Sequence, residues 1–135
     1  MAVKIPKELQ TFIEGKLGWV ASAAADGMPN VAIKGSLRVL DDEHLIFSDF
    51  FSLKTRKNLL ENPKVAVMVY DPENYTGYSF KGSVEMISEG ALYDQTAEMV
   101  KKMQPQLPPI KYVVKITVES IFNQSMGPDA GKQIA

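Results

Sequence analysis

The sequence contains no cysteine, which excludes disulfide bonds, thiolate nucleophiles and cysteine-ligated zinc sites. Its single histidine, His44, stands beside a polar turn at residues 41–43, where a surface role is favoured over the buried, oriented imidazole of a Ser-His-Asp triad. The acidic pair Asp41 and Asp42 is interpreted as turn chemistry, because aspartate is common in turns. No HExxH, P-loop or post-strand GxGxxG motif is present. Any enzymatic reactivity is therefore expected to come from a bound cofactor.

The sequence also lacks an excess of either charge and any long apolar run. Lys plus Arg total 15 and Asp plus Glu total 16, whereas proteins that depend on phosphate contacts with nucleic acid are usually basic. No stretch approaches the roughly 20 apolar residues of a membrane span. The charged N-terminal segment has no apolar core of the kind found in signal peptides. We therefore expect a cytoplasmic protein with neither nucleic acid nor a membrane as its partner.

The residues that are present predict one domain of strands with a few helices. A chain of 135 residues, 45% of them hydrophobic, suits a single domain over residues 1–135. Helical spacing is found near the N-terminus, after residue 52 and after residue 89. Short turns between the strands favour a mainly β (α+β), antiparallel barrel with helices at its ends. Apolar patterns predict six strands, at residues 17–25, 31–40, 44–49, 64–70, 78–88 and 110–122.

Three segments leave alternatives open. Residues 64–70 are apolar at nearly every position, so both faces of this strand are expected to be buried, one of them by a helix or a second subunit. Met99 and Met103 are expected to pack the helix at residues 89–103 onto the sheet, with a methionine-lined ligand pocket as the alternative. The polar, glycine-rich residues 124–135 form either a flexible tail or an arm laid on a partner.

The helix predicted after residue 52 begins with cations where acidic residues are usual. Ser52 is a natural N-cap, and Lys54 and Thr55 follow it in the first turn. The unpaired N–H groups of a first helical turn carry a partial positive charge, which disfavours a lysine there. A bound anion such as phosphate would resolve the conflict. The alternative is a solvated, basic helix face.

The preceding hairpin would bring more polar side chains to the same point. With its turn at residues 41–43, the polar members of the hairpin share a face beside the start of the helix, whereas a slip of one residue would move Ser36 to another partner. Together with Lys54 and Thr55 they would form one anion site. The expected register pairs Leu40 with His44 and Ser36 with Ser48, and sets Lys34 beside Phe50.

The run LRVLDDEHLIFSDFFSLKTRKNLLENPKVAVMVYD, residues 37–71, resembles the FMN-binding split-barrel family related to pyridoxamine 5′-phosphate oxidase. The most diagnostic part is Asn62-Pro63 followed by an apolar strand. The order of the remaining segments also agrees over nearly the whole chain. The resemblance implies a six-stranded antiparallel split β-barrel with flanking helices, and a homodimer that binds FMN at its interface.

For individual residues, the resemblance first implies a phosphate site. Lys54 and Thr55 match the basic and hydroxyl positions that hold the FMN phosphate. Ser48 and Asp49 match the strand end beneath the phosphate and the ribityl chain. Asn58 matches a helix asparagine with a structural role.

The resemblance also implies contacts with the flavin ring. Lys34, Gly35 and Ser36 match the strand segment whose backbone lies against the ring and the ribityl chain. Thr76 and Gly77 fall near a position that contacts the flavin from the other subunit.

The expected function follows from this resemblance and from its departures. The oxidase proper has an Arg-Lys pair where this chain has Lys54-Thr55, and its C-terminal substrate-binding arginine and histidine have no counterpart here. The chain is therefore expected to be an FMN-dependent oxidoreductase acting on another small molecule. An electron carrier or redox sensor, and a cofactor-free barrel, are the alternatives. Some relatives use a deazaflavin or haem, and a lone His44 disfavours haem ligation.

Overall fold

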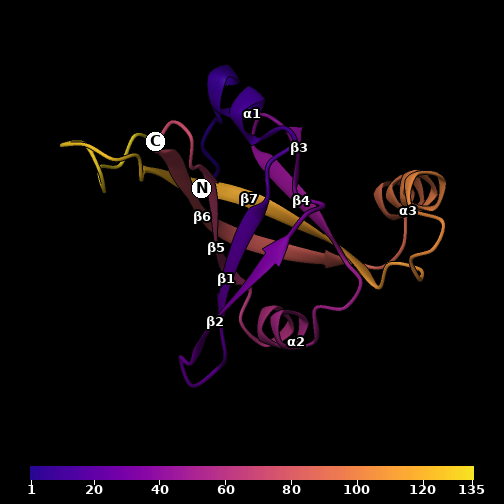
Figure 1. Cartoon of the computed structure of the whole chain (residues 1–135). Helices are drawn as coiled ribbons and strands as arrows, with labels where there is room; N and C mark the ends of the chain where they lie inside the picture. The colour runs from indigo at the N-terminus through magenta and orange to yellow at the C-terminus, as the bar shows by residue number, and fades with distance from the viewer.

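The computed structural model describes all 135 residues as one antiparallel sheet with three helices (Figure 1). The strand order across the sheet is β2-β1-β5-β6-β7-β4-β3, and each neighbouring pair is antiparallel. This is the mainly β, split-barrel class of fold that the sequence predicts. The elements in chain order are α1 (Lys7–Ile13), β1 (Gly18–Ala23), β2 (Pro29–Lys34), β3 (Arg38–Asp41), β4 (His44–Asp49), α2 (Leu53–Glu61), β5 (Lys64–Asp71), β6 (Thr76–Ile87), α3 (Ala91–Met103) and β7 (Tyr112–Asn123).

The two edge strands of the sheet come from one stretch of chain that the sequence pattern predicts as a single strand. β2 ends at Lys34 and pairs with β1, whereas β3 begins at Arg38 and pairs with β4. A turn at Gly35 and Ser36 separates them, so there are seven strands rather than six. Since only three residues join the two edges, the sheet must curl until its edges lie close together. Residues 34–38 therefore lie where the barrel closes.

The barrel core is formed by side chains from most elements, with none from β2 or α3, and β5 contributes through one face only. Val65, Val67 and Val69 of β5 are buried in a cluster of 16 apolar residues, and burying each side chain contributes about 1.5–3 kcal/mol. The alternate residues Ala66 and Met68 are half-exposed. Within one chain the outer face of this strand is therefore only partly covered, and its burial by a second subunit stays a prediction.

Two helices pack closely on the barrel. α1 buries Leu9 and Ile13 in the core and ends before Gly15, whose positive φ of 73° suits a residue without a side chain. α2 buries Leu59 in the core, and its buried Asn58 donates from Nδ2 to the Ser22 hydroxyl of β1 at 3.1 Å. Asn58 thus joins the helix to the sheet, as a structural asparagine would. None of the three helices has the length and apolar character needed to cross a membrane.

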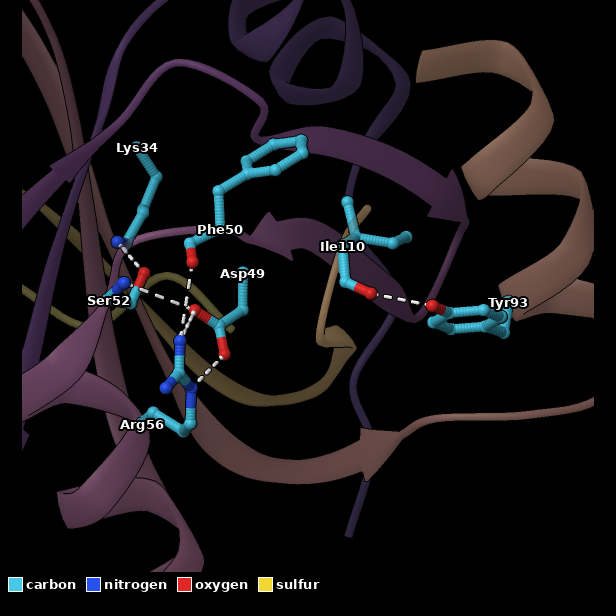
Figure 2. Close-up of polar contacts among 7 residues, drawn as sticks. All are labelled: Lys34, Asp49, Phe50, Ser52, Arg56, Tyr93 and Ile110. Atoms are coloured by element: carbon cyan, nitrogen blue, oxygen red, sulfur yellow. Dashed lines mark hydrogen bonds and ion pairs between the residues drawn. The ribbon is translucent and has the colours of Figure 1, made fainter. Parts of the chain in front are cut away.

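The third helix stands apart from the body of the barrel (Figure 1). Thr96 is the only buried residue of α3. Leu92 and Tyr93 pack on a small apolar cluster around Ile110, and the Tyr93 hydroxyl donates to the Ile110 carbonyl at 2.6 Å (Figure 2). α3 is therefore anchored through its first half.

The last residues of the chain turn back along β7. The Asn123 N–H donates to the Lys132 carbonyl at 2.8 Å, and the Ile134 N–H donates to the Ile121 carbonyl at 2.8 Å. The Ser125 hydroxyl also accepts from the Gly77 N–H at 3.0 Å. In this structure residues 124–135 make these contacts with their own chain.

Candidate functional site

The passage from β4 into α2 is the most polar part of the buried structure. Ser52 occupies the N-cap position, but its side chain does not cap the helix. Its hydroxyl instead accepts a hydrogen bond from the Lys34 ammonium, and its N–H donates to Asp49 Oδ1 at 3.2 Å (Figure 2). The N–H groups of Lys54 and Thr55 make no hydrogen bond within the chain, and the first turn contains no acidic residue. The helix therefore starts with free donors and a positive charge.

An ion pair lies directly behind this helix start. Asp49 is only 1% exposed, and its carboxylate accepts from Arg56 Nε at 2.6 Å and from Arg56 Nη2 at 3.1 Å (Figure 2). Arg56 Nη2 also donates to the Phe50 carbonyl at 3.4 Å. The carboxylate raises the pKa of the Arg56 guanidinium above its already high ordinary value. The pair fixes the end of β4, the loop after it and the first turns of α2 relative to one another.

A cleft of about 790 Å³ opens beside the helix start. One wall is formed by the turn that joins β2 to β3 and by the loop after β4. The other wall is the second half of α3. Its lining includes two cations and no carboxylate, so the cleft is electrostatically suited to an anion. The lining residues are Gly15, Ile33, Lys34, Gly35, Ser36, Leu37, Arg38, Ser48, Phe50, Phe51, Ser52, Met99, Val100, Met103, Gln104 and Leu107.

Neither cation of the cleft has a carboxylate partner. Burial lowers the pKa of Lys34; nearby Asp49 opposes this effect and Arg56 adds to it. The Lys34 ammonium also lies 5.7 Å from the centre of the Phe47 ring. Arg38 is half-buried, and its Nη2 reaches the Thr96 hydroxyl at 3.5 Å. Because neither cation is engaged in an ion pair, both remain able to bind an anionic ligand.

Four of the nine predicted site residues line this cleft, namely Lys34, Gly35, Ser36 and Ser48. The predicted opposition of Ser36 and Ser48 is confirmed, because the Ser48 N–H donates to the Ser36 hydroxyl at 2.9 Å. The predicted pairing of Leu40 with His44 is wrong. A register shift in β3 places Asp41 opposite His44 instead. The shift lies at the turn end and leaves the cleft end of the hairpin in the expected register.

Three predicted residues lie on or behind the helix start. Lys54 is exposed on the first turn of α2. Asp49 is engaged in its ion pair with Arg56. Thr55 is buried, and its hydroxyl accepts a hydrogen bond from Asn30 Nδ2 at 3.5 Å. Only the backbone N–H of Thr55, not its side chain, is thus available to a ligand at this end of the helix.

The last two predicted residues lie elsewhere. Thr76 and Gly77 begin β6, opposite Asp71 and Tyr70, and do not line the cleft of their own chain. A Cβ atom at Gly77 would lie 2.6 Å from the Tyr70 ring, so close packing explains this glycine.

Sequence reasoning missed a cationic residue and the aromatic loop of the cleft, and it gave the methionine-lined α3 wall only as an alternative. Arg38, Phe50 and Phe51 line it, and so do Met99 and Met103. The prediction that these methionines pack α3 onto the sheet is wrong, since Met103 is 69% exposed and both face the cleft. Their helical spacing was a usable signal, because a Met-rich face suits an adaptable ligand pocket as well as a core.

Comparison with known proteins identifies the family to which this architecture belongs. The fold and the cleft define a split barrel with a site suited to an anionic ligand. The family described as pyridoxamine 5′-phosphate oxidase matches residues 5–125, and the chain belongs to this family. An uncharacterised protein of Methanocaldococcus jannaschii is 39% identical over 135 residues, covering 98% of this chain and 89% of that protein.

Solved structures share this fold. HupZ from group A Streptococcus superposes with a TM-score of 0.82 at 35% identity, covering 94% of this chain and 99% of that chain. An FMN-binding protein from Syntrophomonas wolfei superposes with a TM-score of 0.69 at 19% identity, covering 90% and 84% of the two chains. At that identity the second likeness shows the shared fold alone.

Proposed function

We propose that the protein binds FMN in this cleft and acts as an FMN-dependent oxidoreductase on a small molecule. The observation that carries the proposal is the composition of the cleft: two cations without counter-ions, no carboxylate, and the free N–H groups of α2 beside it. Membership of the pyridoxamine 5′-phosphate oxidase family, together with a fold shared with an FMN-binding protein, supports the same ligand. Bound FMN would supply two-electron transfer, and the chain would hold, orient and shield it.

The donors of the cleft fit a phosphorylated ligand. Lys34 lines the cleft, and Lys54 and Thr55 follow the lining residue Ser52 on the first turn of α2. The N–H groups of Lys54 and Thr55 and the two lysine ammonium groups would hold the phosphate, since helix N-termini and cations both attract anions. Lys34, Ser36 and Ser48 offer further polar contacts along the cleft. Gly35 leaves room for a close approach, because a Cβ atom there would meet nothing nearer than Leu17 Cδ2 at 3.8 Å.

An apolar wall completes the fit. Phe50, Met99 and Val100 line the cleft and would exclude water from a planar, apolar ring system. The same residues would let a small substrate lie against the ring.

We also propose that the protein forms a homodimer. The outer face of β1 and β2 carries Trp19, Val31 and Ile33, which are 43%, 63% and 49% exposed, and Met68 of β5 lies beside Trp19. A second copy would cover this face. Thr76 and Gly77, which lie away from their own cleft, are proposed to serve the flavin of the partner.

One observation favours a second candidate, a flavin-binding electron carrier or redox sensor. No Asp, Glu, His or Tyr lines the cleft, so apart from Lys34 the chain offers no group suited to proton transfer. An electron carrier needs no group for proton transfer to a substrate.

The chromophore of the purified protein tests the cofactor. We expect a yellow protein that releases FMN on denaturation; a deazaflavin, haem or a colourless protein that does not take up added FMN would contradict the proposal. Bleaching by NADH or NADPH with turnover on an added acceptor would support the enzyme, and a flavin without turnover would support the carrier.

The phosphate site is tested by Lys54→Ala. We expect FMN binding to weaken by about 1–3 kcal/mol, the value of a charged hydrogen bond. Lys57→Ala is the matched control, because Lys57 is also an exposed cation of α2 but follows the first turn. Fluorescence titration measures both; equal affinities in the two variants would refute this assignment of Lys54.

A further inference from the structure

The Asp49–Arg56 ion pair places a buried carboxylate next to the proposed phosphate site. Asp49 Oδ1 lies 3.2 Å from the Ser52 N–H, at the positive end of α2. A carboxylate at this position competes with any ligand anion for the same partial charge and repels it. The fold nevertheless keeps this carboxylate, 1% exposed, next to the cleft.

Arg56 offsets the repulsion between Asp49 and a ligand anion by pairing with the carboxylate. Its guanidinium meets both carboxylate oxygens, at 2.6 and 3.1 Å, and its side chain is 18% exposed. The charge of Asp49 is therefore neutralised where it stands, while its oxygen still accepts from Ser52. Nothing else in the chain forms an ion pair with Asp49.

Both charges of the pair are felt inside the cleft. Lys34, whose ammonium contacts the Ser52 hydroxyl, responds electrostatically to Asp49 and to Arg56 with opposite sign. Removing either partner would thus change the potential experienced by an anion at the helix start.

We infer that Arg56 is a positioning and specificity-determining residue: by neutralising Asp49 and holding the loop before α2, it sets the preference of the site for phosphorylated over unphosphorylated flavin. The inference rests on the proposed FMN function. Arg56 Nε and Nη2 already donate to Asp49 and to the Phe50 carbonyl, so Arg56 acts through Asp49 and Ser52 rather than by touching the ligand.

Two single variants are expected to move the FMN-to-riboflavin affinity ratio in opposite directions. Arg56→Gln leaves an uncompensated carboxylate behind the phosphate, so FMN affinity should fall about tenfold or more with little change for riboflavin. Asp49→Asn leaves an uncompensated guanidinium, so the ratio should rise above that of the wild type. Loss of structure alone would weaken the binding of both flavins together. It could not move the affinity ratio in opposite directions in the two variants.

A double variant tests the charge directly. Asp49→Asn/Arg56→Gln removes both charges and leaves amide groups that can hydrogen-bond, and it should restore a ratio close to that of the wild type. Arg56→Lys keeps the charge and should retain most of the preference. Should Arg56→Gln fail to fold, Asp49→Asn and the double variant still give the predicted rise and recovery.

Isothermal titration with FMN and with riboflavin gives the ratio for each protein. Equal losses for both flavins in Arg56→Gln, or a ratio that does not rise in Asp49→Asn, would overturn the inference and leave FMN binding intact. Equal binding of FMN and riboflavin by the wild type would also overturn it. A wild type that binds neither flavin would refute the proposed function and, with it, this inference.

Discussion

Lys34 is the side chain on which folding and ligand binding place opposite demands. Its ammonium is half-buried, has no carboxylate partner and contacts only a hydroxyl and the face of an aromatic ring. Desolvation lowers its pKa, so the charged form is disfavoured in the free protein. A ligand phosphate would supply the missing counter-charge, which explains why such a residue is placed at the rim of the cleft.

FMN affinity is expected to depend on pH through Lys34. The pKa of Lys34 in the free protein lies below its ordinary value of 10.5, and a bound phosphate would raise it again. Affinity should therefore be constant at lower pH and fall as pH rises through the lowered pKa, because binding then requires proton uptake. Lys34→Arg should flatten the profile, since a guanidinium stays protonated. Titrations of both proteins with FMN between about pH 7 and 10.5 measure this pH dependence. Identical profiles would exclude Lys34 as the group whose titration controls FMN affinity.

The same shift makes a stability prediction for the free protein. With a folded-state pKa below the unfolded one, the unfolded chain binds more protons in the window between them, so the free energy of unfolding rises with pH there. Lys34→Met, which has no charge to desolvate, should remove this rise and should not lower the thermal midpoint at neutral pH. A drop of many degrees would mean that the lysine supports the fold rather than the ligand.

At the residue scale, the register at the cleft end of the hairpin was predictable, whereas the shift at its turn end and the ion pair were not. Ser36 faces Ser48 because a short turn fixes which residues of the two strands lie opposite each other. Asp49 was predicted to lie beneath the ligand, but nothing in the sequence shows that Arg56 would reach back from the next helix to meet it. That contact depends on how α2 docks, which is a tertiary property.

At the scale of elements, the crossing between β2 and β3 shows the limit of local patterns. The alternation of residues 31–40 continues through the break, so periodicity predicts one strand. Whether a strand changes partners midway depends on sheet closure. The α3 helix is a similar case: its span was predictable, but the side on which its methionines lie was not.

Gly82 is predicted to be essential to the pairing of β6 with β7. The register shifts between Lys81 and Gly82, and a Cβ atom at Gly82 would lie 1.9 Å from the Thr117 carbonyl oxygen. Gly82→Ala should therefore lower the free energy of unfolding by about 1–3 kcal/mol or more. Gly35→Ala, with open space around its Cβ, is the matched control and should change it by less than about 0.5 kcal/mol. Urea denaturation measures both, and equal stabilities would contradict the account.

At the scale of the whole molecule, the exposed apolar face of β1 and β2 is the main feature left unexplained by one chain. The apolar run in β5 led to the expectation of a second cover, and in the structure the exposed side chains lie mostly on the neighbouring strands. The sequence could show that an apolar face exists, but not which strands present it.

Trp19→Glu is predicted to convert a dimer into a monomer. The wild type should sediment as a dimer at micromolar concentration, because burying this face removes large apolar side chains from water. Leu60→Glu is the control, since Leu60 is 53% exposed but lies on α2. In the wild type, where Trp19 is the only tryptophan, its fluorescence should shift to the red when the dimer dissociates on dilution. A wild-type monomer would contradict the proposed assembly.

The proposed function requires that the start of α2 and the adjoining cleft hold the phosphate and ring of FMN. A crystal structure of the protein grown with excess FMN tests it most directly. We predict phosphate density against the N–H groups of Lys54 and Thr55, with the ring beside residues 34–36. Density elsewhere, or a bare helix start with the Lys54 side chain directed into solvent, would contradict it.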